Sequence, residues 1–135
     1  MAALPALSAT LHVALGGALG AVLRHQAGRG MTQLFGPPVM VAFPWATLAV
    51  NVIGSVAMGV LAGWLARHGD DGERWRLLIG VGVLGGFTTF SAFSLEMMLL
   101  IERGQALTAL TYALVSMLAG LAGLYLGLVA WRLAA

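Results

Sequence analysis

The chain has 135 residues, of which 60% are hydrophobic and 9% are charged, and its formal net charge is +2. Soluble domains carry about 25% charged residues, so this composition indicates an integral membrane protein. All seven basic residues are arginines scattered along the chain, which gives no patch typical of nucleic-acid binding. The apolar runs are long and aliphatic and lack the alternation of a β-barrel strand, so the spanning elements are predicted to be helices.

Four segments have the length of about 20 apolar residues that a helix needs to cross a bilayer. In chain order, the predicted spans are 10–28, 45–66, 77–101 and 106–131. A proline-rich turn region over 35–44 separates the first two spans, the charged loop 68–76 the next two, and a tight turn at 102–104 the last two. The sequence thus predicts one four-helix transmembrane domain over residues 1–135, with both termini on the same side of an inner or plasma membrane.

Each predicted span contains two glycines four residues apart, a spacing that lets helix backbones approach closely in lipid. The pairs are Gly16 and Gly20, Gly59 and Gly63, Gly82 and Gly86, and Gly123 and Gly127. These pairs predict a tight helix bundle and do not indicate a particular ligand.

The arginines barely favour one side of the membrane. Four of them lie on the side of the termini (Arg67, Arg74, Arg76 and Arg132), and three lie on the opposite side (Arg24, Arg29 and Arg103). The positive-inside rule needs a clear excess to fix an orientation. The chain therefore either inserts both ways, so that two copies pair antiparallel, or takes a single orientation set by other features.

The stretch 85–96, GGFTTFSAFSLE, is unusually polar for a membrane span. Glycine costs about 1 kcal/mol relative to alanine inside a helix, and threonine is also a weak helix former. Gly85 and Gly86, followed by Thr88 and Thr89, therefore favour a third helix that is broken near its middle. A break frees main-chain carbonyls at mid-membrane, where they can bind a hard cation such as sodium.

Three polar side chains within or beside the spans have two possible roles each. Asn51 either bonds a neighbouring helix or donates to an anion path. Arg24 either snorkels to the interface or supplies a cation at a pore mouth. Glu96, a carboxylate well inside a span, either carries protons or ends a polar track near one mouth.

Aromatic and hydroxyl residues accompany these groups on the third and fourth spans. Phe87, Phe90 and Phe93 recur every third residue, and their electropositive ring edges can face a small anion as well as pack. Tyr112 and Ser116 lie four residues apart on one face of the fourth helix. The histidines His12, His25 and His68 are dispersed without a metal-ligand spacing, and we interpret them as structural or interfacial.

Three segments resemble the signature segments of the Fluc/CrcB fluoride channel family. They are GGALGAVLR at 16–24, TLAVNVIGS at 47–55 and GGFTTFSAFSLE at 85–96. Their order and spacing, the four-span layout and the chain length all fit, so the resemblance covers nearly the whole chain. It implies a fluoride-selective channel, not an enzyme, that passively exports fluoride from the cytoplasm and so lowers its toxicity.

The resemblance further implies an antiparallel, dual-topology homodimer with two fluoride pores and a structural Na⁺ that is not transported. The main-chain carbonyls of Gly85 and Thr88 of both subunits match the ligands of this sodium ion at the dimer interface. Phe90 and Phe93 match the pore-facing phenylalanines, and Asn51 matches the asparagine of the second helix. Arg24 matches the family arginine, and we place it at the pore mouth. The matching polar track consists of Ser91, Ser94, Tyr112 and Ser116, with Glu96 near the pore end.

The sequence departs from the family pattern at three positions: Ala92 replaces a usual threonine, Ala46 a frequent glycine, and His25 a common aromatic residue. These departures concern local packing more than the assigned sodium and phenylalanine positions. Two other functions fit four short helices. One is a small proton-coupled exporter of cationic compounds that uses Glu96, and the other is a membrane scaffold that transports nothing.

Overall fold

The computed structural model describes residues 4–134, and nearly all of them are helical. Within this range, four helical segments are long and apolar enough to cross a membrane. They are α1 (Ala6–Phe35), α3 (Trp45–His68), a third segment over Glu73–Glu102, and α7 (Ala106–Ala134). The third segment comprises α4 (Glu73–Trp75), the π-helical η2 (Arg76–Leu84), α5 (Gly85–Phe87) and α6 (Phe90–Glu102). The prediction of an all-α protein with four apolar spans is confirmed.

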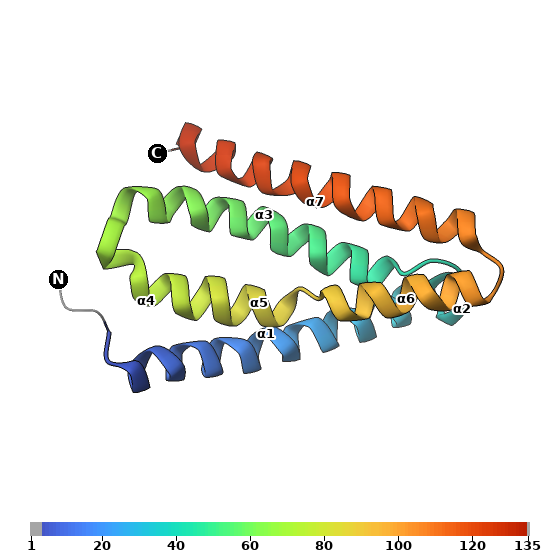
Figure 1. The fold of residues 1–135 in the computed structure, drawn as a ribbon, viewed down its shortest axis with the longest axis horizontal. Coiled ribbons are helices and arrows are strands. Elements are labelled where there is room, and N and C mark those ends of the chain that lie inside the picture. Colours follow the sequence, from blue (N-terminus) through green and yellow to red (C-terminus); the bar gives the residue numbers. More distant parts are fainter. Residues whose placement is uncertain (1–3, 135) are drawn as a thin grey trace.

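The helices extend beyond the predicted spans, and the connections between them are short. The predicted turn over 35–44 contains a short helix, α2 (Pro37–Ala42). Proline lacks an amide N–H, but the first turn of a helix has no intrahelical acceptor for that group. Pro37 and Pro38 are therefore compatible with the start of α2. The charged loop includes a short 3₁₀ helix, η1 (Gly69–Gly72). As predicted, the start of α1 and the end of α7 lie at the same end of the molecule (Figure 1).

Close helix contacts occur where glycines face a neighbouring helix. A methyl group added to Gly16 would meet the carbonyl oxygen of Leu78 on η2, and one added to Gly59 would meet that of Leu124 on α7. All four predicted glycine pairs lie at such contacts, those of α1 against the third segment and those of α3 against α7. The fold is therefore built from two tightly packed helix pairs.

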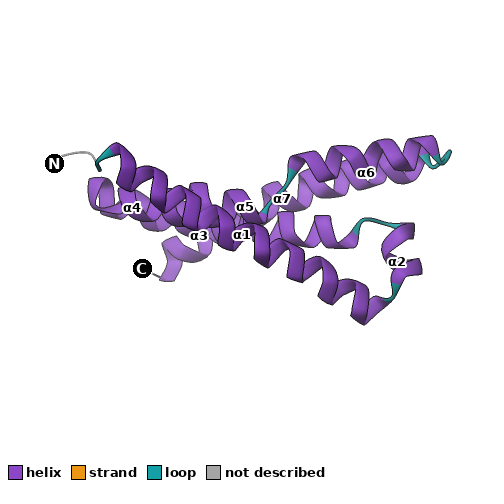
Figure 2. Cartoon of the chain, turned by 90° about the horizontal axis from the view of Figure 1, so that it is seen from below, coloured by secondary structure: helices purple, strands orange, loops and turns teal. Residues whose placement is uncertain are grey.

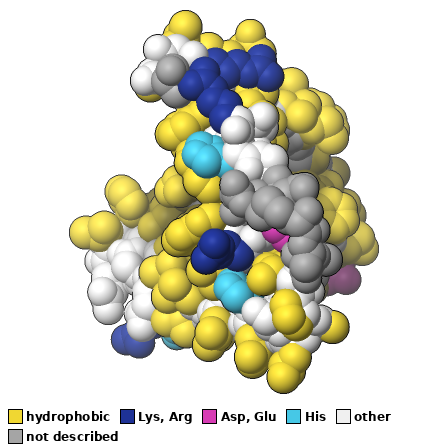
Figure 3. All heavy atoms as spheres, turned by 90° about the vertical axis from the view of Figure 1, so that its left-hand side faces the viewer, with side chains coloured by type: hydrophobic (Ala, Val, Ile, Leu, Met, Phe, Trp, Pro, Cys, Tyr) yellow, Lys and Arg dark blue, Asp and Glu magenta, His cyan; other side chains and the backbone are white. Residues whose placement is uncertain are grey.

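Most large apolar side chains point away from the helix contacts. Tyr112 is fully buried, and Val50, Leu84 and Leu100 are nearly so, whereas many leucines on α1 and α7 are exposed. Figure 3 looks onto the end where the chain starts and finishes, and shows hydrophobic side chains on the flanks with basic and histidine side chains on the end face. This outward hydrophobicity is what a lipid environment requires.

The third segment is interrupted at Thr88 and Thr89, midway along its length. Both residues have extended backbones, with ψ of 160° and 125°. Gly85 and Gly86 remain helical, and the Thr89 hydroxyl caps α6 by accepting a hydrogen bond from the N–H of Ala92 at 3.2 Å. The predicted break is confirmed, and it lies at the threonines because threonine is a favourable residue at a helix start.

Beyond this break, α6 and α7 diverge from α1 and α2 (Figure 2). Open cavities lie along α1 on this side, between α1, α3 and the start of α6. The break thus separates a tightly packed half of the molecule from a half that is open on one side.

Candidate functional site

The side chain of Asn51 on α3 holds the backbone at the break. Its Oδ1 accepts a hydrogen bond from the N–H of Thr89 at 2.8 Å, and its Nδ2 donates to the carbonyl of Thr89 at 3.1 Å. This is the interhelical role that the sequence left open as one of two alternatives. A primary amide carries two N–H donors, so one is still available to a ligand. The anion contact of Asn51 stays a prediction.

The same hydrogen bonds change the partners of two main-chain carbonyls. In a continuous helix, the N–H of Thr89 would donate to the carbonyl of Gly85, and that of Ala92 to the carbonyl of Thr88. Here these N–H groups donate to Asn51 Oδ1 and Thr89 Oγ1 instead. The carbonyls of Gly85 and Thr88, the two predicted sodium ligands, thereby lose their usual helix donors. Carbonyl oxygens without such donors are suitable ligands for a hard cation.

Glu96 on α6 is bound by hydroxyl groups from two other helices. Thr47 Oγ1 on α3 donates to Oε1 at 2.6 Å, and the Tyr112 hydroxyl on α7 donates to Oε2 at 2.7 Å. Both donors are buried. Glu96 also lines a cavity of about 220 Å³ together with Arg103, beside the turn between α6 and α7. The arrangement joins three helices around one carboxylate near one end of the molecule.

Phe90 and Phe93 lie together but have different surroundings. Their ring centroids are 5.7 Å apart. Phe90 is 79% exposed, although it lies near the centre of the third segment. The ring of Phe93 packs on that of Tyr112, with centroids 5.0 Å apart, and belongs to the apolar cluster around Leu100. Phe90 is thus open to a ligand or a second chain, whereas Phe93 also contributes to packing.

The predicted serines are arranged less uniformly. Ser91 Oγ lies 3.4 Å from Thr89 Oγ1, and Ser94 Oγ donates to the carbonyl of Phe90 at 2.9 Å within α6. Ser116 Oγ on α7 is buried and has no hydrogen-bond partner among the described residues. Of the three hydroxyls, that of Ser116 therefore has the strongest need for a further ligand.

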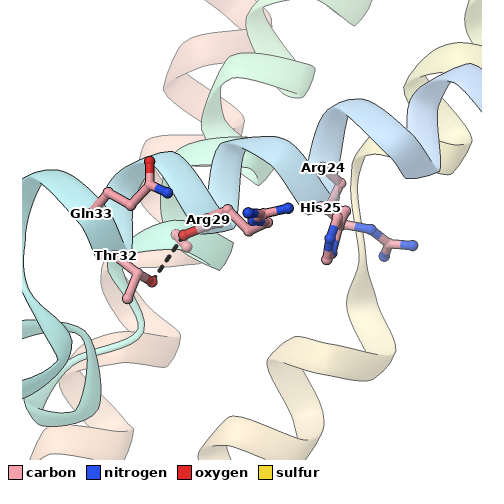
Figure 4. Close-up of a pocket in the computed structure, with 7 residues that line it drawn as sticks. Arg24, His25, Arg29, Thr32 and Gln33 are labelled. Carbon is pink, nitrogen blue, oxygen red and sulfur yellow. Dashed lines mark hydrogen bonds between the residues drawn. The ribbon is translucent and has the colours of Figure 1, made fainter.

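Two cavities include residues of the break, and a third adjoins one of them along α1. One of about 300 Å³ brings Asn51 and Phe90 together with Ser55 and Thr88. Two others, of about 560 and 390 Å³, share Arg24, and the smaller of these reaches Thr89. Figure 4 shows the larger one, with Arg24, His25, Arg29, Thr32 and Gln33 all projecting from α1. Arg24 therefore lines a cavity that reaches Thr89 at the break, and its place at a pore mouth stays a prediction.

Sequence reasoning missed the role of Thr47, and it linked Thr89 to the break but not to Asn51. Thr47, Asn51 and Ser55 recur every fourth residue, which places them on one face of α3. This spacing is a signal that would have linked Thr47 to Asn51. Thr89 acts through its backbone and as a helix cap, and the hydrogen bond that Asn51 makes to it joins residues 38 positions apart. No local pattern identifies such a partner.

The chain is similar in sequence to known proteins over nearly its whole length. The family model described as "CrcB-like protein, Camphor Resistance (CrcB)" matches residues 11–128. A fluoride-specific ion channel FluC from Erythrobacter litoralis is 56% identical over 134 residues, which cover 98% of both chains. Two further proteins of that name come from Novosphingobium aromaticivorans, 60% identical over 90% of this chain and 94% of the relative, and Caulobacter vibrioides, 47% identical over the same shares.

These matches extend over all four membrane-spanning helices and include every residue of the candidate site. They confirm the resemblance drawn from the three sequence segments and identify a multi-pass membrane protein. The chain belongs to the CrcB/FluC family.

Proposed function

We propose that this chain is a fluoride-selective channel that lets fluoride leave the cytoplasm down its gradient, and not an enzyme. The observation that carries the proposal is the broken third helix, where Asn51, Thr88 and Phe90 line one cavity. The family match and the names of the relatives support the choice of ion. Fluoride is small and strongly hydrated, so a selective path must replace part of its water shell with fixed donors.

The polar track supplies such donors at the depth of the break. The free amide hydrogen of Asn51 and the hydroxyl of Ser116 are available, while the ring edges of Phe90 and Phe93 add positive potential. A narrow path with these donors favours a small anion over the larger chloride. Ser91, Ser94 and Tyr112 extend the track, and Glu96 lies near one end of it.

We infer that the active form is an antiparallel, dual-topology homodimer of one four-helix domain, residues 1–135. Phe90 and Gly85 are exposed at mid-span, and Arg24 is only half-buried a few residues beyond the level of the break. Polar backbone and a guanidinium at this depth are costly against lipid, which supports a second copy on this face. The near-balance of arginines on the two sides allows insertion in both orientations.

We also propose a structural Na⁺ at the centre of this dimer. The carbonyls of Gly85 and Thr88 fit the ion because both have lost their helix donors, and two copies would supply four oxygens. The ion would hold the two breaks together and would not permeate. Hard oxygen ligands of this kind suit a hard cation.

The exporter and scaffold alternatives have less support. An exporter needs a carboxylate that is free to bind substrate and protons in turn, whereas both oxygens of Glu96 accept hydrogen bonds from Thr47 and Tyr112. The buried hydroxyl of Ser116 has no hydrogen-bond partner among the described residues. A scaffold that transports nothing gives no reason for such a group. Neither alternative accounts for the family match.

Ion efflux from liposomes tests the proposed function. Purified protein is reconstituted into vesicles loaded with fluoride or with chloride, and an ion-selective electrode follows the release of each anion. The channel predicts rapid fluoride release with chloride retained, and protein-free vesicles provide the background. Equal release of the two anions, or none of either, would contradict the proposal.

A further inference from the structure

His25 lies where two cavities along α1 meet. The cavities of about 560 and 390 Å³ share Arg24, His25, Gly28 and Ala46. The larger extends along α1 to Arg29 and Gln33, and the smaller extends to Thr89 at the break. Figure 4 shows the imidazole beside the guanidinium of Arg24, with the Arg29 side chain extending toward both. An ion that moves along α1 toward the break therefore passes this imidazole.

The position of His25 along the helix requires either water or a second chain beside the ring. Gly20 contacts Gly86 and Phe87 just before the break. A helix rises about 1.5 Å per residue, so His25 lies about 7.5 Å farther toward the membrane surface than that contact. An exposed ring at this depth is favourable only where water fills the cavity or another chain covers it.

The same cavity collects all three departures from the family pattern. Ala46 and Ala92 line the 390 Å³ cavity together with His25. Two of these positions carry small apolar side chains, so the imidazole is the one substituted group that can act chemically there. Of these three positions, only His25 brings a group that can carry a charge into the cavity.

The charges around His25 are almost entirely basic. Arg24 and Arg29 share its helix, and the residues of α3 and the start of α6 that line the two cavities are neutral. Glu96 lines neither cavity and accepts a hydrogen bond from Thr47, which lines the smaller one. At the far end of the third segment, Arg76 and Glu73 bond each other, and Arg74 lies between them in the sequence.

We propose that His25 is an additional cationic residue at the ion entrance, whose charge depends on pH and sets how fast fluoride reaches the break. This inference rests on the proposed channel function. An imidazole gains its positive charge between about pH 8 and pH 5. One added charge on the order of 7 Å from an anion in water raises its local concentration about threefold.

Electrical recording in planar bilayers tests this role, because neutral hydrogen fluoride crosses lipid without carrying current. Fluoride current is measured at equal pH on both sides, stepped from about pH 8 to about pH 5.5, the range in which imidazole titrates. We expect the wild-type current to rise about threefold, in line with one added charge. His25→Phe keeps a ring without an ionisable nitrogen and should give a low current at every pH. His25→Arg should give a high current at every pH.

His12→Phe is the matched control. His12 bonds the carbonyl of Ser8 near the other end of α1 and lines neither cavity, so this variant should keep the wild-type pH profile. A wild-type fluoride current that does not change with pH, or a His25→Phe current that rises as in wild type, would overturn the role of His25. Absence of fluoride current in all variants at every pH would instead overturn the channel function, and this inference with it.

Discussion

Asn51 and Thr89 are joined by two hydrogen bonds: Asn51 Oδ1 accepts from the Thr89 N–H, which has lost its helix partner at the break, and Asn51 Nδ2 donates to the Thr89 carbonyl at the start of α6. A buried main-chain group without a partner costs about 1–3 kcal/mol, so this one side chain stabilises an otherwise unfavourable backbone. It also takes the amide that would otherwise satisfy the carbonyl of Gly85. One residue on α3 therefore both permits the break and frees a predicted cation ligand.

Replacing Asn51 with alanine should destabilise the protein more than any neighbouring polar change. Asn51→Ala leaves the N–H of Thr89 unpaired and removes one of the donors to its carbonyl, which predicts a loss of about 1–3 kcal/mol. Thermal unfolding in detergent measures the loss. Ser55→Ala is the control, because the Ser55 hydroxyl bonds only the carbonyl of Asn51 on its own helix. Equal melting temperatures for the two variants would show that the hydrogen bonds from Asn51 to Thr89 do not stabilise the fold.

The glycine contacts give a second prediction, in which two adjacent positions serve as test and control. A methyl group at Gly16 would meet the backbone of Leu78 and Gly82, whereas one at Gly17 meets nothing within 4 Å. Gly16→Ala should lower the melting temperature by forcing α1 away from η2. Gly17→Ala should leave it unchanged or raise it, since alanine is favoured over glycine in helices by about 1 kcal/mol. A lower melting temperature for Gly17→Ala than for Gly16→Ala would show that α1 does not pack through Gly16.

The sequence predicts the break because its cause is local, in weak helix formers followed by threonines that can cap a helix. It also predicts the helix contacts, since glycines four residues apart expose backbone on one face. It does not predict that Thr47 and Tyr112 both bond Glu96, because these hydrogen bonds join residues 49 and 16 positions apart. Nor does the three-residue spacing separate Phe90 from Phe93, whose surroundings depend on how α6 packs on α7.

The carboxylate site gives a third prediction. Tyr112→Phe removes the donor to Glu96 Oε2 but keeps the ring that packs on Phe93. Hydrogen bonds to charged groups contribute about 1.5–3 kcal/mol, so we expect a loss of that size in unfolding free energy. The same change should also slow fluoride efflux if the hydroxyl belongs to the polar track. Tyr125→Phe is the control, since Tyr125 is 64% exposed on the outer face of α7. If Tyr112→Phe loses no more unfolding free energy than Tyr125→Phe, the hydrogen bond to Glu96 does not stabilise the fold.

Sodium removal gives a fourth prediction, which tests the carbonyl site without changing its residues. A cation that binds only the folded dimer stabilises it by about 2.7 kcal/mol when its concentration is a hundred times its dissociation constant. The melting temperature should therefore fall when Na⁺ is replaced by a large organic cation. Titration with Na⁺ should restore it, and K⁺ should restore less. A melting temperature that is the same with and without Na⁺ would exclude a structural ion at Gly85 and Thr88.

The two phenylalanines give the last prediction, because their different burial separates pore function from packing. Phe90→Ile should reduce fluoride efflux with little change in the stability of the monomer fold, since the ring is 79% exposed. Phe93→Ile should reduce both, because its ring also packs on Tyr112 in the apolar cluster. Phe35→Ile, at the exposed end of α1, is the control and should affect neither quantity. Efflux is measured from vesicles and stability by thermal unfolding of the same preparations. If Phe90→Ile conducts as well as Phe35→Ile, the Phe90 ring does not face the fluoride path.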